Sequence, residues 1–178
     1  MLLVLTGKTA SGKDTIMSRL LVKYPQIKRV VTTTSRPPRQ NEQDGVDYHF
    51  ISKEDFRKKI DQGVFLEYVE YGGNLYGTEK NELKTVSGQD LIWRIDPSRA
   101  GRIKDTLPAI VIYVTTDNDV VLQRLKKRNL TDEEIKKRMQ QDQQFWNQYK
   151  DRYDFVVENE PGKLEQTMDQ IYSIYENT

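Results

Sequence analysis

The sequence predicts an α/β fold with a parallel β-sheet at its centre. Four short apolar runs, rich in β-branched residues, have the composition of strands that are buried on both faces. They are Leu2–Leu5, Asp90–Ile95, Ala109–Val114 and Phe155–Val157. The stretches between these runs have helical periodicity, as crossover helices between parallel strands do. A chain of 178 residues, 36% of them hydrophobic, is long enough for one core, so we expect a single domain.

A small inserted subdomain is predicted at about residues 32–78, between core segments at about 1–31, 79–122 and 151–178. Two segments inside it, Asp47–Ile51 and Phe65–Tyr71, alternate between apolar and polar residues, which is typical of half-exposed strands. Ser52 has the side chain of an N-cap residue for a helix Lys53–Gln62 between them.

Two helices are predicted towards the end of the chain, Asp117–Arg128 and Asp132–Lys150. Thr131 followed by Glu134 is the pattern of a capping box, which starts the second helix. This second helix is long, polar and charged, so two interpretations stay open: a helical lid at about residues 123–150, or a solvated face.

The composition argues against several classes of protein. No apolar run reaches the roughly 18 residues of a membrane span, and the apolar start is expected to be a strand rather than a signal segment. The chain has no cysteine for disulfides or thiolate metal sites, and its single histidine, His49, argues against a histidine-based metal site. The net charge of +1 favours neither nucleic acid nor acidic lipid. We expect a cytoplasmic protein that binds neither nucleic acid nor membrane.

The segment Gly7–Thr15 follows the first strand and precedes a helical segment, with the spacing GxxxxGK. Gly7 and Gly12 allow a turn whose backbone N–H groups point inward, the helix N-terminus adds positive partial charge, and Lys13 adds a point charge. This order predicts a phosphate-binding loop for a nucleoside triphosphate, made of Gly7, Lys8, Thr9, Ala10, Ser11, Gly12, Lys13, Asp14 and Thr15.

Asp14 stands where this motif usually has a serine or threonine whose hydroxyl binds Mg²⁺. Two interpretations are open. Thr15, or Asp14 through a water molecule, takes part in holding the ion, or Asp14 only complements the helix dipole in the first turn.

Two arginines, Arg36 and Arg39, lie three residues apart on the proline-containing segment TTTSRPPR (residues 32–39), after a strand predicted at Arg29–Val31. Guanidinium groups at this spacing can both bind one dianionic group. They suggest a second phosphate site.

Taken together, four ordered segments resemble the guanylate kinase family: TTTSRPPR, DGVDYHF (residues 44–50), FLE (residues 65–67) and YGGNLYGT (residues 71–78). The resemblance extends from the phosphate-binding loop to RYDFVVEN (residues 152–159) and implies a P-loop kinase fold with an acceptor-binding insert and a lid. It implies a cytoplasmic enzyme that uses Mg²⁺ and transfers the γ-phosphate of ATP to GMP or dGMP.

The resemblance also assigns roles to residues. The acceptor GMP would be bound by Thr32, Arg36, Arg39, Tyr48, Glu67, Tyr76, Thr78 and Asp96. Lys13, Arg124, Arg128 and Arg138 would act in catalysis, and Asn159 would lie near the donor adenine. A carboxylate such as Glu67 can accept from both N1–H and the exocyclic amine of guanine, which adenine does not offer. The acceptor phosphate is already a nucleophile and needs no general base, so the catalytic side chains need only stabilise the negative charge of the transition state.

Arg94 departs from the family pattern, because the family usually has an acidic residue there that helps to bind guanine. Two interpretations of Arg94 stay open: it forms an ion pair with Asp96 or Glu67, or it binds an additional anionic group of another acceptor. Ribose 1,5-bisphosphate phosphokinases, whose phosphate loops resemble GKD followed by a hydroxyl residue, give an alternative function. A non-catalytic guanylate-kinase-like binding module gives another. The acceptor segments fit a nucleotide better, and Lys13, Arg128 and Arg138 fit an enzyme better.

Overall fold

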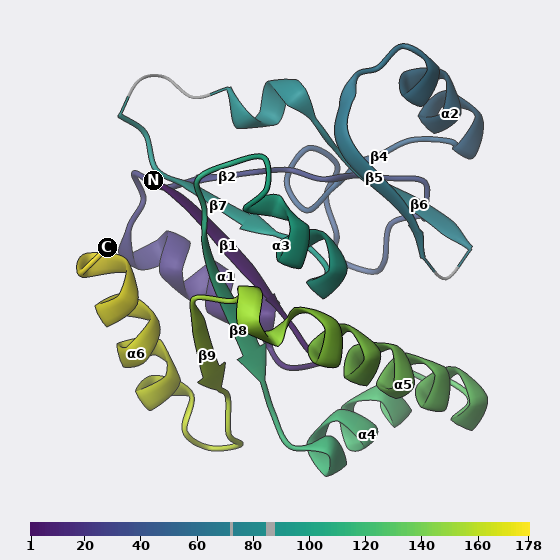
Figure 1. Ribbon diagram of the computed structural model, residues 1–178. Coiled ribbons are helices and arrows are strands. Elements are labelled where there is room, and N and C mark those ends of the chain that lie inside the picture. Colours follow the sequence, from purple (N-terminus) through teal and green to yellow (C-terminus); the bar gives the residue numbers. More distant parts are fainter. Residues whose placement is uncertain (72, 85–87) are drawn as a thin grey trace. The chain divides into compact units, whose positions relative to one another are not determined.

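The computed structural model describes residues 1–71, 73–84 and 88–178 (Figure 1). Within these residues the chain forms two units, residues 1–28 with 92–178, and residues 29–91. The second unit includes the whole predicted insert, and the predicted lid belongs to the first. Gly72, in the segment YGGNLYGT, and residues 85–87, in the predicted core, lie outside the described residues.

A five-stranded sheet forms the centre of the first unit. Its strands are, in spatial order, β2 (Lys28–Arg29), β7 (Leu91–Arg94), β1 (Leu2–Gly7), β8 (Ile110–Thr115) and β9 (Phe155–Glu158). The pairs β1–β8 and β8–β9 are parallel, as predicted. Because parallel strands end at the same edge, the loop after β1 lies beside the ends of its neighbours.

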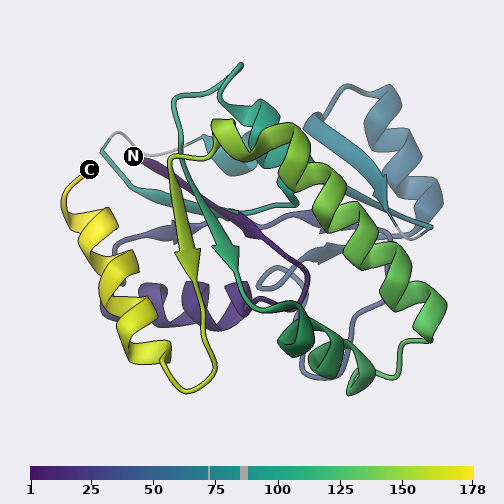
Figure 2. The same cartoon turned by 60° about the horizontal axis from the view of Figure 1, so that its bottom comes forward.

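Helices cover both faces of this sheet (Figures 1 and 2). One face carries α1 (Lys13–Lys23) and α6 (Leu164–Glu176), and its core includes Leu5, Ile112 and Met168. The opposite face carries α3 (Pro97–Ile103) and α5 (Asp132–Tyr149), which lie against each other. The remaining elements are α4 (Asn118–Lys126) and a 3₁₀ turn, η2 (Lys150–Arg152).

The α5 helix is only partly a solvated face. The ring of Trp146 on α5 lies 4.9 Å from that of Tyr113 on β8, and Tyr113 stacks on Tyr153. Ile135 at its start is buried with Leu125 of α4. One side of α5 therefore belongs to the core of the first unit.

The second unit is a four-stranded sheet with one helix. Its strands are, in spatial order, β4 (His49–Phe50), β3 (Thr33–Thr34), β6 (Asn74–Glu79) and β5 (Phe65–Tyr71). A 3₁₀ turn, η1 (Lys80–Leu83), follows β6 in the chain. The helix α2 (Lys53–Asp61) packs through Phe56, whose ring stacks on Phe65 at 4.3 Å, beside Leu75.

Both predicted helix caps are confirmed. The Ser52 hydroxyl accepts from Asp55 N at 3.0 Å, and the capping box of Thr131 and Glu134 is complete. These side chains satisfy N–H groups that the first helical turn leaves without partners.

Several predicted elements are shorter in the structure. The strand predicted at Arg29–Val31 ends at Arg29, because Val31 N donates to the Glu82 carboxylate at 3.1 Å instead of to a strand. The helix predicted to reach Arg128 ends at Lys126, followed by Asn129 with φ 57°, a left-handed conformation that stops a helix.

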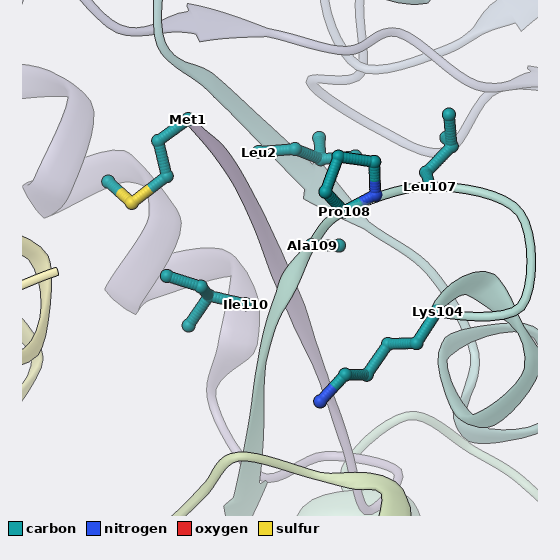
Figure 3. Close-up of a pocket in the computed structure, with 7 residues that line it drawn as sticks. All are labelled: Met1, Leu2, Lys104, Leu107, Pro108, Ala109 and Ile110. Atoms are coloured by element: carbon teal, nitrogen blue, oxygen red, sulfur yellow. The ribbon is translucent and has the colours of Figure 1, made fainter.

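A cavity of about 450 Å³ lies at the amino-terminal ends of β1 and β8, bordered by Met1, Leu2, Lys104 and Leu107–Ile110 (Figure 3). This is the edge of the sheet opposite the loop Gly7–Gly12. Ligands of open α/β sheets bind beyond the carboxyl ends of the strands, so the functional site is expected at the other edge. No helix among the described residues is long and apolar enough to span a membrane.

Candidate functional site

The loop between β1 and α1 has the backbone that the sequence predicts. Gly7 has φ 137°, and a Cβ there would lie 2.0 Å from Val114 O. Gly12 has φ 95°, at the N-cap of α1. Only glycine fits both positions without strain. The loop therefore passes close to the backbone of Val114 at the end of β8 and then continues into the first turn of α1.

Lys13 is held inside this loop. Its Nζ donates to Gly7 O at 2.9 Å, to Lys8 O, and to Ser11 Oγ at 3.3 Å. Burial of the ammonium lowers the pKa of Lys13 to about 7, Asp142 opposes that shift, and nearby arginines add to it. Lys13 is half-buried, so its ammonium interacts more strongly with an anion in the loop than it would in bulk water.

Three of the predicted site residues fasten the loop to the rest of the first unit. Asn159 Nδ2 donates to Ser11 O at 2.7 Å, and Arg124 Nη1 donates to Ala10 O at 2.7 Å. Lys8 Nζ donates to Thr116 O at 3.0 Å and to Asn118 Oδ1 at 2.9 Å. The contacts of Asn159 and Arg124 are structural, and their roles at the adenine and at the transferring phosphoryl group stay predictions.

Asp142, on α5, reaches the same loop and was not predicted. One carboxylate oxygen accepts from Thr9 N at 2.8 Å and the other from Thr9 Oγ1 at 3.3 Å. The sequence contained a signal for it. Asp142 lies four residues before Trp146 and seven after the buried Ile135, so helical spacing places it on the packed side of α5.

Arg94, at the end of β7, forms an ion pair with Asp14 of α1. Burial, and then the charge of Arg99, lower the pKa of Arg94 to about 10. Asp96 caps α3 and pairs with Arg99. Asp14 was not among the partners predicted for Arg94, because the two residues are far apart in the sequence and only the fold brings the end of β7 to the start of α1.

Arg128 and Arg138, the two other lid arginines, belong to the same unit. The charge of Arg128 contributes to the lowered pKa of Lys13, which places it within electrostatic range of the loop. Arg138 is on α5, one turn before Asp142 and half-buried. Their part in catalysis stays a prediction.

In the second unit, three residues predicted to read the base lie in a row. Glu67 on β5 is opposite Thr78 on β6. Thr32 directly precedes β3, whose Thr33 is opposite Gly77 of β6, so the same register extended by one residue places Thr32 opposite Thr78. Residues directly opposite in antiparallel strands point to the same side of the sheet. Thr78 is fully buried and Thr32 is 5% exposed. A carboxylate and two hydroxyls thus share one face, opposite the face that Phe56 and Phe65 cover.

Four residues predicted to bind the acceptor phosphate are also in this unit. Tyr76 lies two residues before Thr78 on the same strand, and its ring is 6.3 Å from that of Tyr48. The Arg36 guanidinium lies 5.4 Å from the Tyr48 ring and donates to Glu42 at 2.9 Å. Glu42 also accepts from Arg39 N at 2.7 Å. Glu42, which the motif analysis missed, holds the arginine loop in shape.

The comparisons with known proteins agree with this arrangement. A family model described as guanylate kinase matches residues 1–178. The chain belongs to the guanylate kinase family. A guanylate kinase of Desulfitobacterium hafniense is 34% identical over 178 residues, covering 98% of this chain and 88% of that protein. One of Symbiobacterium thermophilum is 37% identical over 164 residues, covering 90% and 78%.

A solved structure has the same fold. The crystal structure of guanylate kinase from Anaplasma phagocytophilum has a TM-score of 0.77 at 24% identity, and the match covers 99% of this chain and 85% of that one. The predicted α/β P-loop kinase fold is confirmed. The guanylate kinase family makes the protein an ATP-dependent, nucleotide-binding kinase.

Proposed function

We propose that this protein catalyses transfer of the γ-phosphate of ATP to GMP or dGMP, and that Mg²⁺ accompanies the donor. The observation that carries the choice of acceptor is the row of Glu67, Thr78 and Thr32 on one face of the small sheet. The relatives at 34 and 37% identity are named guanylate kinase, which supports the same substrate here.

The donor phosphates bind in the loop Gly7–Thr15. Its main-chain N–H groups and the N-terminus of α1 supply hydrogen bonds and positive partial charge, and Lys13 supplies a full charge. Side-chain hydrogen bonds of Asn159, Arg124 and Lys8 fix the loop to the rest of the first unit. The loop is therefore organised before the phosphates arrive, which reduces the cost of binding them.

Guanine is distinguished from adenine by the row in the second unit. The Glu67 carboxylate accepts from the N1–H and the exocyclic amine of guanine, and the hydroxyls of Thr32 and Thr78 donate to O6. Adenine offers neither the two donors nor the carbonyl oxygen, so each of these hydrogen bonds would be lost, at a cost of about 1–3 kcal/mol for each one. Arg36, Arg39, Tyr48 and Tyr76 hold the GMP phosphate by charge-assisted hydrogen bonds.

Asp14 and Thr15, at the start of α1, are both exposed and can hold Mg²⁺ directly or through water. Mg²⁺ is usually bound by one or two carboxylates together with substrate phosphates. When bound, the ion neutralises charge on the β- and γ-phosphates. Asp96, which caps α3, is a further acceptor-site residue in this proposal.

The transfer step needs no general base from the protein. An oxygen of the GMP phosphate attacks the γ-phosphorus, the bond to the bridging oxygen of ATP breaks, and ADP leaves. Lys13, Arg124, Arg128 and Arg138 stabilise the negative charge that spreads over the transferring group. Lid motion of residues 123–150 brings these arginines to the phosphoryl group.

A coupled assay for ADP formation across GMP, dGMP, AMP, UMP, CMP and ribose 1,5-bisphosphate tests this proposal. We expect turnover with GMP and dGMP and little with the other nucleotides. Turnover with ribose 1,5-bisphosphate alone would replace the acceptor. Binding of GMP with no turnover of any acceptor would make the chain a binding module. A cytoplasmic location, and no binding to nucleic acid or membrane, are part of the proposal.

A further inference from the structure

The carboxylate of Asp142 accepts hydrogen bonds from donors of the phosphate-binding loop Gly7–Thr15. Thr9 is the third residue of the motif that starts at Gly7, and both its N–H and its hydroxyl point at Asp142, at 2.8 and 3.3 Å. Such N–H groups are the ones that bind phosphate oxygens in loops of this kind. A carboxylate is a smaller anion with the same preference for N–H donors.

Two lysines of the phosphate-binding loop, Lys8 and Lys13, act electrostatically on Asp142. Asp142 is the anion that raises the pKa of Lys13, against the effect of burial, and Lys8 and Lys13 both favour its ionised form. Burial acts in the other direction and raises the pKa of Asp142. The carboxylate is thus an internal partner of the cations that a donor phosphate would use.

Asp142 is also fixed to a helix that the proposed mechanism requires to move. It lies one turn after Arg138 and one turn before Trp146 on α5, and Trp146 packs on Tyr113. The loop and α5 belong to the same unit, and α5 carries Arg138, one of the predicted lid arginines. The contact between Asp142 and Thr9 therefore ties the lid helix to the donor loop.

We propose that Asp142 is an internal competitor of the donor triphosphate: it holds the N–H and the hydroxyl of Thr9, and a triphosphate must displace it, which releases α5 from the loop. This inference rests on the proposed donor site but not on the identity of the acceptor. Displacement costs part of the binding free energy, so Asp142 weakens donor binding and couples it to the position of α5.

Calorimetric titrations with ATP and with inorganic tripolyphosphate, each with and without Mg²⁺, test the competition. Asp142→Asn keeps the size of the side chain and removes its charge, and Asp142→Ala removes the contact. Glu133→Gln makes the same charge change at an exposed position on the same helix and is the matched control. Tryptophan fluorescence in the same titrations, measured in a Trp93→Phe background so that Trp146 is the emitting residue, reports the movement of α5.

We expect both Asp142 variants to bind ATP and tripolyphosphate about tenfold more tightly than the natural protein, with or without Mg²⁺. Glu133→Gln should bind as the natural protein does. The Trp146 signal should change when donor is added to the natural protein and change less in Asp142→Ala.

Equal or weaker binding by Asp142→Asn and Asp142→Ala would overturn the proposal. Weaker binding only in the presence of Mg²⁺ would make Asp142 a ligand of the ion instead. No binding of ATP or tripolyphosphate to any variant would contradict the donor site itself. Because tripolyphosphate binding is independent of the acceptor, failure to phosphorylate GMP would not affect this result.

Discussion

The donor loop of the first unit and the acceptor face of the second are built in different ways. The loop Gly7–Thr15 is continuous in sequence, and its binding groups are mainly backbone N–H groups set by Gly7 and Gly12. The acceptor face takes side chains from several strands and loops of residues 29–91. A backbone loop tolerates changes in most of its side chains, whereas a face of side chains can change its ligand with one substitution. The two regions should therefore respond differently to mutation.

The largest effect is expected at Lys13. Replacing it by methionine keeps most of the volume and removes the cation, so transfer from ATP should fall by about 1,000-fold. The coupled assay with GMP measures this. Thermal unfolding and GMP binding should be nearly unchanged, since Lys13 contacts only its own loop through its described hydrogen bonds. An unchanged rate would mean that Gly7–Thr15 is not the donor site.

Glu67→Gln should have a smaller effect, confined to the acceptor. The amide can accept from only one guanine donor and turns its own N–H₂ towards the other, so kcat/KM for GMP should fall by about 10- to 100-fold. Steady-state kinetics with each substrate varied in turn would show it, with KM for ATP unchanged. An equal change in KM for ATP would erase the distinction between the two regions. Lys59→Gln, on α2 and paired with Glu79, is a control within the same unit.

The pH dependence of ATP binding isolates the donor loop. The pKa of Lys13 is about 7 in the protein, below its ordinary value, so free Lys13 is charged below that pH and neutral above it. Bound phosphates favour the ammonium, so affinity should be greatest below about pH 7 and fall by up to tenfold per unit above it. Calorimetry in two buffers of different ionisation enthalpy should detect proton uptake at about pH 8. Affinity that stays constant across this range would contradict the assignment.

The smallest effect concerns the pair of Asp14 and Arg94. Arg94 is the more buried partner, at 18% side-chain exposure against 67% for Asp14. A double-mutant cycle of Asp14→Asn and Arg94→Met should give a coupling free energy of about 1 kcal/mol in urea unfolding. Additive effects would show that the two departures from the family pattern are independent. A loss of GMP turnover in Arg94→Met alone, with stability kept, would place Arg94 in the acceptor site.

The same contrast explains what the sequence could predict. The loop, the parallel strands and the capping box of Thr131 and Glu134 depend on neighbours within a few residues, and all are found in the structure. The burial predicted for Phe155–Val157 is wrong at two positions, because β9 lies at the edge of the sheet and leaves Phe155 38% and Val156 50% exposed. The strand predicted to reach Val31 was too long because its N–H bonds to Glu82, more than 50 residues away, and no local pattern records that contact.

The candidate site shows the same limit. Glu67, Thr78 and Thr32 were assigned through resemblance to a family, because strand register brings them together and their spacing does not. Glu42 and Asp142 were missed because neither lies within a motif, although the residues that they hold, Arg36 and Thr9, do. The sequence did contain a signal for Asp142, since helical spacing places this carboxylate on the same side of α5 as Ile135 and Trp146. The polar composition of the whole helix obscured that signal.

Following the label from ATP carrying ³²P at its γ-phosphate, in the presence of GMP, tests the phosphoryl transfer directly. Label should appear in the β-phosphate of GDP, dependent on Mg²⁺, with Glu67→Gln slowing its appearance and Lys13→Met nearly abolishing it. Label that stays in ATP, or that appears only as inorganic phosphate, would contradict transfer to GMP.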